Sequence, residues 1–203
     1  MRLSPLAGLL ACVLSAQIIP FESNGLQYQT LTKGGMTVMF AYLPARLKEY
    51  SIVQVSISNG SPVAWTIKPT DFSYQQQDGT ALQALAALAV VNNLLAKGSR
   101  HDVVKLVTTY ERGVYGNEKM QTTNGYESRR QSALAEGVSA RLKAGAAASA
   151  IALVPAKLQS GESTDGAVFF PSNGKLLGPG TLVFHAAGEQ FEFPSEGEPN
   201  PGK

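Results

Sequence analysis

The sequence predicts an α+β fold in which an antiparallel β-sandwich is interrupted by a helical insertion at about 80–150. Two stretches, 36–77 and 151–193, are rich in β-branched and aromatic residues, as strands are. Between them the hydrophobic period changes to that of helices. Because strands lie on both sides of the insertion, a single domain over 17–193 accounts for both stretches, with about four strands from each.

The first β stretch contains strands and a tight turn. Asn59-Gly60 predicts a hairpin between the strands that flank it, because both residues tolerate the positive φ of such a turn. Trp65, the single tryptophan, falls within a strand and is expected in the core rather than stacked on a ligand. The strands are expected at 36–43, 51–58 and 63–67, with a further short one around Phe72 and Tyr74.

About three helices are expected in the insertion. Thr80 and Gln83 have the spacing of a capping box at the start of the first helix. This helix is apolar on nearly every face, which favours a helix buried on most sides over one that enters a membrane. The third helix ends in AGAAASA, whose small side chains let another backbone approach closely. The helices are expected at 81–97, at about 99–113 and at about 126–150.

Strand character returns after the insertion. Strands are expected at 151–154, 167–170, 181–184 and 190–193, joined by turns rich in glycine and proline. The last ten residues, 194–203, contain three prolines and no large apolar side chain, which predicts a disordered tail.

Two segments carry a resemblance to a known fold. SIVQVSISNGSPV (51–63) and ESTDGAVFFP (162–171) resemble the immunoglobulin-like sandwich domains common in exported bacterial proteins. In those domains a strand ends in an Asn turn, and a late strand follows a turn rich in Pro, Gly, Glu and Ser. The resemblance covers about 100 residues, and the insertion departs from it. It implies an immunoglobulin-like fold and no particular function.

The opening segment, 1–16, predicts a secretory signal peptide. Arg2 is followed by an apolar run and then by the small residues Ser15 and Ala16. The protein is therefore expected to be exported, to the periplasm or the secreted fraction. In the alternative, Leu9 to Cys12 resembles the lipobox of bacterial lipoproteins, and Cys12 carries a lipid anchor. Cleavage is preferred because the residues after Cys12 are apolar, whereas a tether should be polar.

The charge balance argues against nucleic acid as a partner. The chain has 17 basic and 15 acidic residues, a net charge of +2. The distribution is uneven, since 97–143 carries a net charge of +4 and 144–203 one of −3. Two oppositely charged segments of one fold attract one another, so no external anion is needed to explain them.

No recognisable catalytic or metal-binding motif is present. In Gly161–Gly166 the second glycine comes one place too late for a serine-hydrolase elbow, and a triad would need Asp165 and His185. His101 and His185 are 84 residues apart, without the spacing of metal ligands. Glycine-rich phosphate-binding motifs are also missing. Neither a metal nor a cofactor is expected.

One cluster, at the expected start of the third helix, is a candidate binding site. Adjacent arginines on a helix point about 100° apart, so Arg129 and Arg130 face different partners. One braces the helix by pairing with Glu127 or with an acid of the C-terminal strands, and the other is free for a carboxylate or phosphate. The candidate site residues are Tyr110, Arg112, Tyr126, Arg129 and Arg130.

These observations favour a non-catalytic exported protein that binds or scaffolds another envelope or secreted component. The alternative is an enzyme or small-ligand carrier with a site between the helical insertion and the sheet, using Arg129, Arg130, His101 or His185. A further alternative is a membrane-associated role through the 81–96 helix. Membrane contact is expected only through that helix or a lipid anchor.

Overall fold

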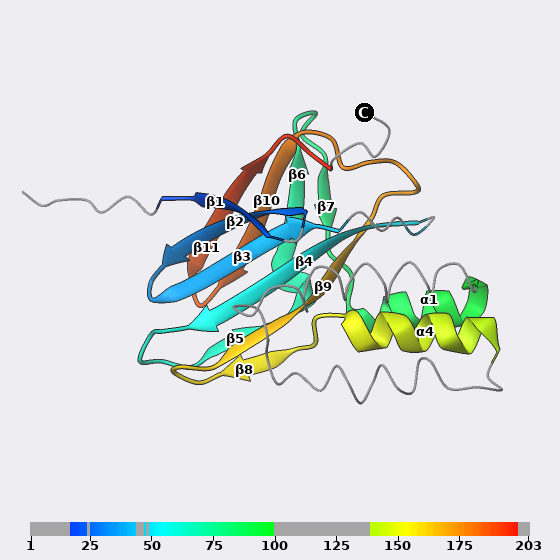
Figure 1. Cartoon of the computed structure of the whole chain (residues 1–203), viewed down its shortest axis with the longest axis horizontal. Coiled ribbons are helices and arrows are strands. Elements are labelled where there is room, and N and C mark those ends of the chain that lie inside the picture. The colour runs from blue at the N-terminus through cyan, green and yellow to red at the C-terminus, as the bar shows by residue number, and fades with distance from the viewer. Residues whose placement is uncertain (1–16, 24, 44–46, 48, 100–138, 199–203) are drawn as a thin grey trace, which may run out of the picture.

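The computed structural model describes residues 17–23, 25–43, 47, 49–99 and 139–198. Within them the chain forms antiparallel β-sheets and two α-helices, which confirms the α+β class (Figure 1). The helices lie side by side at one end of the larger sheet (Figure 1).

The larger sheet has five strands and is antiparallel throughout, in the order β1-β2-β3-β4-β9. Its strands are β1 Ile19–Ser23, β2 Leu26–Lys33, β3 Met36–Tyr42, β4 Tyr50–Asn59 and β9 Ser163–Pro171. Nine of the ten residues of β4 are buried, because both faces of this strand, which lies between β3 and β9, are covered.

The second sheet has four antiparallel strands in the order β11-β10-β6-β7, and a two-stranded sheet pairs β5 with β8. The four strands are β6 Phe72–Gln76, β7 Ala81–Gln83, β10 Gly180–Ala186 and β11 Glu189–Ser195. The small sheet consists of β5 Trp65–Ile67 and β8 Ala156–Leu158, and a short 3-10 helix η1 spans Pro69–Asp71.

The two larger sheets share one hydrophobic core. Phe40 of β3 contacts Phe193 of β11, with ring centroids 5.0 Å apart. Phe184 of β10 lies at the centre of the second sheet's inner face, stacked on Phe72 at 4.4 Å and next to Phe191 at 5.6 Å. All of these rings are fully buried, so the facing sheets account for most of the aromatic surface removed from water.

The helices cover the apolar end of the outer face of the larger sheet. They are α1 Ala87–Lys97 and α4 Ala140–Ile151. A Cβ on Gly145 would lie 2.7 Å from the side chain of Leu95, so the small-residue end of α4 allows the close approach that the sequence predicted. Asn93 of α1 donates hydrogen bonds to the Glu49 carboxylate and the Tyr50 hydroxyl. A polar side chain thereby attaches the otherwise apolar helix to the sheet.

The predicted hairpin at Asn59-Gly60 is wrong. β4 pairs with β3 and β9, whereas β5 pairs with β8, and neither turn residue has a positive φ. Asn59 instead forms the turn with its fully buried side chain, whose Oδ1 accepts hydrogen bonds from the Ser61 N–H and hydroxyl. The Ser61 hydroxyl in turn accepts a 2.8 Å bond from Trp65 Nε1. Trp65 is 4% exposed, which confirms its place in the core.

The first helix begins later than predicted, because the Thr80–Gln83 capping box does not form. Residues 81–83 are strand β7, and α1 starts at Ala87. The Thr80 N–H donates to the carboxylate of Asp78 at 2.8 Å. The Gln83 side chain donates to the carbonyl oxygens of Thr70 and Phe72, each at 2.6 Å. The Asp78 side chain therefore stabilises the β6–β7 turn, and the Gln83 side chain attaches the end of β7 to η1 and the start of β6.

The predicted strand at 151–154 is also wrong. Ile151 ends α4, and Ala152 then makes an isolated parallel bridge to Ala167. The chain crosses β9 closely because Gly166 has no side chain, and a Cβ there would lie 2.5 Å from Leu153 Cα. The apolar character of this segment therefore reflects burial at a crossing rather than membership of a sheet.

The tail predicted at 194–203 is in part ordered. β11 continues to Ser195, and the Glu198 N–H donates to the Leu177 carbonyl at 2.8 Å. The strands β1 and β2 were not predicted at all. Of the helices predicted at 99–113 and 126–150, the structure describes only the second one's end as part of α4, since 100–138 lies outside the described residues.

Candidate ligand-binding cleft

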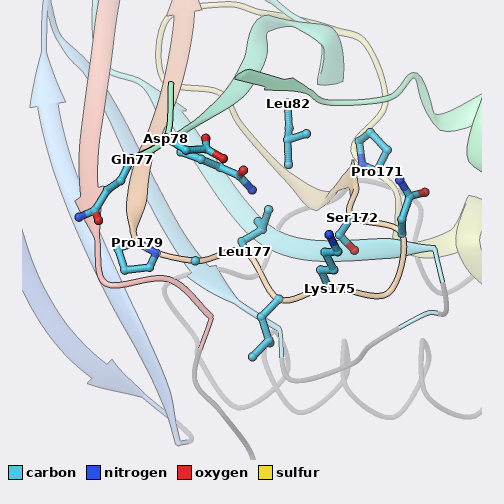
Figure 2. Close-up of a pocket in the computed structure, with 12 residues that line it drawn as sticks. Gln77, Asp78, Leu82, Pro171, Ser172, Lys175, Leu177 and Pro179 are labelled. Atoms are coloured by element: carbon cyan, nitrogen blue, oxygen red, sulfur yellow. The ribbon is translucent and has the colours of Figure 1, made fainter. Parts of the chain in front are cut away.

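An open cleft of about 470 Å³ lies where the β6–β7 turn meets the loop from β9 to β10 (Figure 2). It is lined by residues 76–78, Leu82, 171–173 and 175–179. The volume falls within the range of about 300–1,000 Å³ that is typical of small-ligand sites. The two walls come from segments nearly 100 residues apart in sequence, which the pairing of β10 with β6 brings together.

Backbone hydrogen bonds hold the β9–β10 loop in place. The N–H groups of Ser172 and Asn173 donate to the Glu49 carbonyl at 3.0 and 3.3 Å. The Lys175 N–H donates to the Ser172 carbonyl at 3.0 Å. At the far end of the loop, the Gln77 N–H donates to the Pro179 carbonyl at 3.3 Å and so links the two walls. The loop is therefore attached to the rest of the chain at both ends.

A group of tyrosines supports the same loop from behind. The Tyr74 hydroxyl donates to the Gly178 carbonyl at 2.6 Å, and the Tyr42 hydroxyl lies 3.2 Å from that of Tyr74 and 2.8 Å from Ser195 Oγ. Burial raises the pKa of Tyr42 far above its ordinary value, so this hydroxyl stays protonated. The bond from Glu198 to Leu177 adds a further attachment from the C-terminal segment.

Opposite charges stand on the two walls of the cleft. Figure 2 shows Asp78 and Lys175 on opposite sides, with Leu82 and Leu177 between them. Hydrogen bonds from Thr80 hold the pKa of the exposed Asp78 carboxyl below its ordinary value, so Asp78 is negatively charged at neutral pH. Lys175 is exposed and forms no ion pair within the described part of the chain. The cleft thus combines an apolar centre with one charge of each sign.

The two residues that a serine-hydrolase triad would need, Asp165 and His185, are not brought together. Asp165 of β9 is buried on the outer face of the larger sheet, beside Gln54, whose Nε2 donates to it at 3.5 Å. His185 of β10 is exposed on the opposite, outer face of the second sheet, since its neighbour Phe184 points into the core. The shared core of the two sheets separates the two side chains.

The predicted binding cluster is not described by the structure. Cys12, His101, Tyr110, Arg112, Tyr126, Arg129 and Arg130 all lie outside the described residues. Among residues 17–99 and 139–198, apart from the short gaps given above, no group of three or more His, Cys, Asp or Glu side chains is placed to hold a metal ion. In the same part of the chain, neither helix has the length and apolar character to cross a bilayer.

The sequence does not reveal the cleft, because it predicts the loop only as a connection between two strands. PSNGKLLGPG is longer than a hairpin turn needs to be, and it contains two leucines and a lysine among turn residues. Such length and composition were the available signal. The opposite wall, Gln77-Asp78, carried no signal of its own beyond a turn.

No family model and no curated protein matches the chain. Among solved structures, the crystal structure of the yjhA protein from Bacillus subtilis aligns with 82% of this chain and 76% of its own length. The sequence identity is 9% and the TM-score is 0.32. A likeness this weak supports no inference about fold or function.

Proposed function

We propose that the protein is an exported, non-catalytic binding protein of the cell envelope or secreted fraction, and that its ligand occupies the cleft. The observation that supports this most directly is the cleft itself. Its loop is attached by backbone hydrogen bonds, and an exposed charge of each sign stands beside an apolar centre. A site held in its binding geometry loses less conformational entropy when a ligand binds.

The protonation state of Asp78 suits the binding of a cation rather than general-acid catalysis. A general acid at neutral pH needs a carboxyl pKa raised toward 7. The pKa of Asp78 is lowered instead, by the hydrogen bonds from Thr80. Asp78 therefore acts as a permanent negative charge, which suits recognition of a cationic group.

We also propose that the two facing sheets are an immunoglobulin-like sandwich. Their shared aromatic core and antiparallel order support this arrangement, as does the agreement of β4 and β9 with the two resembling segments. In such sandwiches ligand sites lie in loops at the ends of strands, and the cleft occupies that kind of position.

Filling the cleft tests the binding function. A Cβ on Gly178 meets no atom within 4 Å, so Gly178→Trp places a large side chain at the cleft without backbone strain. We expect every probe that binds the wild-type cleft to lose about tenfold or more in affinity, because the indole occupies its site. The measurement is ligand-observed NMR with amino acids, short peptides, monosaccharides and nucleotides.

The matched control is Thr66→Trp, which adds the same side chain at an exposed position of β5 away from the cleft. It should leave probe binding unchanged. The proposal is wrong if no probe binds the wild type, or if the probes bind Gly178→Trp as tightly as Thr66→Trp.

Export is tested by the intact mass of the mature protein in soluble and membrane fractions of its host. We expect a soluble species that begins near Ala16 or Gln17, because cleavage is favoured after the small residues of the signal peptide. A membrane species that begins at an acylated Cys12 would replace free export with a lipid anchor. A full-length species that retains Met1 to Ala16 would contradict export altogether.

A further inference from the structure

We propose that the cleft binds a short zwitterionic peptide, with its ammonium group toward Asp78 and its carboxylate toward Lys175. The inference rests on the proposed binding function and specifies its ligand. The arrangement of one carboxylate, one ammonium and an apolar centre carries it (Figure 2).

The two charges select against ligands of a single sign. A simple anion attracted to Lys175 meets the repulsion of Asp78, and a simple cation meets that of Lys175. A neutral ligand would remove water from both charged groups without giving either a partner. A zwitterion gives each charge a partner of opposite sign in one binding event.

The volume of the cleft, about 470 Å³, favours a peptide over a free amino acid. Asp78 and Lys175 belong to opposite walls and form no ion pair with each other, so their separation exceeds a direct contact. A free amino acid carries both charges on one carbon atom. Each added residue of an extended peptide moves its termini about 3.3–3.6 Å further apart.

The remaining lining residues fit the middle of such a peptide. Leu82 and Leu177 offer an apolar surface to a central side chain (Figure 2). Gln76 and Ser172 supply hydrogen-bonding side chains that suit the N–H and C=O groups of a peptide bond. The two walls of the cleft therefore offer complementary chemistry to both termini and to the middle of a two- or three-residue ligand.

The test uses the tripeptide Gly-Leu-Gly and two modified forms of it, titrated into the 15N-labelled protein by NMR. N-acetylation removes the ammonium charge, and C-terminal amidation removes the carboxylate. The variants are Asp78→Asn, which retains an oxygen to accept the Thr80 N–H, and Lys175→Gln. Glu192→Gln and Lys157→Gln are the controls, since both residues are exposed and lie outside the cleft.

We expect each modification of the peptide to weaken binding to the wild type about two- to fivefold, as for exposed ion pairs. Acetylation should have no further effect in Asp78→Asn, and amidation none in Lys175→Gln. The control variants should discriminate among the peptides as the wild type does. This pattern assigns each terminus to one residue.

Two results would contradict the proposed peptide ligand while leaving the proposed binding function intact. In the first, all three peptides bind equally and still lose affinity in Gly178→Trp. In the second, none of the peptides binds, but a probe of another class binds the wild type and fails to bind Gly178→Trp. If no probe distinguishes Gly178→Trp from the wild type, the proposed function itself fails, and this inference fails with it.

Discussion

Asn59→Ala is expected to lower the free energy of unfolding by about 3–5 kcal/mol. The Asn59 side chain is fully buried and donates to the carbonyl oxygens of Val63 and Leu158 at 2.7 and 3.0 Å. It also accepts the N–H and the hydroxyl of Ser61 at 2.9 and 2.7 Å. Each bond contributes about 1 kcal/mol net, and the partners left without a bond add a desolvation cost. Urea denaturation followed by circular dichroism measures the difference.

The matched control for this change is Asn92→Ala on the exposed face of α1. It should alter stability by about 0.5 kcal/mol or less, as surface substitutions do. Equal midpoints and slopes for the two variants would show that the turn does not depend on the Asn59 side chain.

Phe184→Ala is expected to cost about 3–5 kcal/mol, because it removes a buried ring and leaves a cavity. Phe184 is stacked on Phe72 and lies beside Phe191 at the centre of the shared core. We expect a cooperative transition at lower temperature in differential scanning calorimetry. Given a typical total stability of about 5–15 kcal/mol, the variant is close to the limit of folding.

His185→Ala provides the comparison for Phe184→Ala, since it changes the next residue of the same strand. The His185 side chain is exposed on the other face of the second sheet. Its loss should shift stability by about 0.5 kcal/mol or less. A comparable loss in both variants would contradict the assignment of the inner face.

The strands that the sequence predicts well are those with a strong hydrophobic signal. β4, β9, β10 and β11 all fall on predicted segments, because their inner residues are large and apolar. β2 was missed because LQYQTLTK is rich in glutamine and threonine, and only Leu26, Tyr28 and Leu31 of it are buried. β1 lies at the edge of the sheet and pairs only with β2 among the described strands. Its sequence therefore carries little of the apolar pattern that would indicate a strand.

The wrong predictions of a hairpin and of a capping box have a different origin. In both, a polar side chain forms hydrogen bonds that the local sequence pattern does not predict. Asn59-Gly60 has the composition of a hairpin turn, but the Asn59 amide binds Val63 and Leu158 and directs β5 to β8. Likewise Thr80 and Gln83 have capping-box spacing, yet the Thr80 N–H binds Asp78 in the β6–β7 turn and the Gln83 side chain binds the carbonyl oxygens of Thr70 and Phe72. Local spacing does not reveal which distant backbone group a polar side chain will bind.

The cleft could not be derived from local patterns at all. Its two walls meet only because β10 lies between β11 and β6, an order that a list of strands does not contain. Lys175 and Asp78 each belong to a turn-forming segment with an ordinary composition. The two residues line the same cleft only because of the order of the strands in the second sheet.

The way in which the β9–β10 loop is attached determines which of its side chains can be substituted. The bonds that hold the loop use the N–H groups of residues 172, 173 and 175 and the carbonyl oxygens of 177, 178 and 179, which do not depend on side-chain identity. Exposed side chains such as Lys175 can therefore be exchanged while the loop keeps its course. Single substitutions of exposed loop residues therefore require no compensating change in the core.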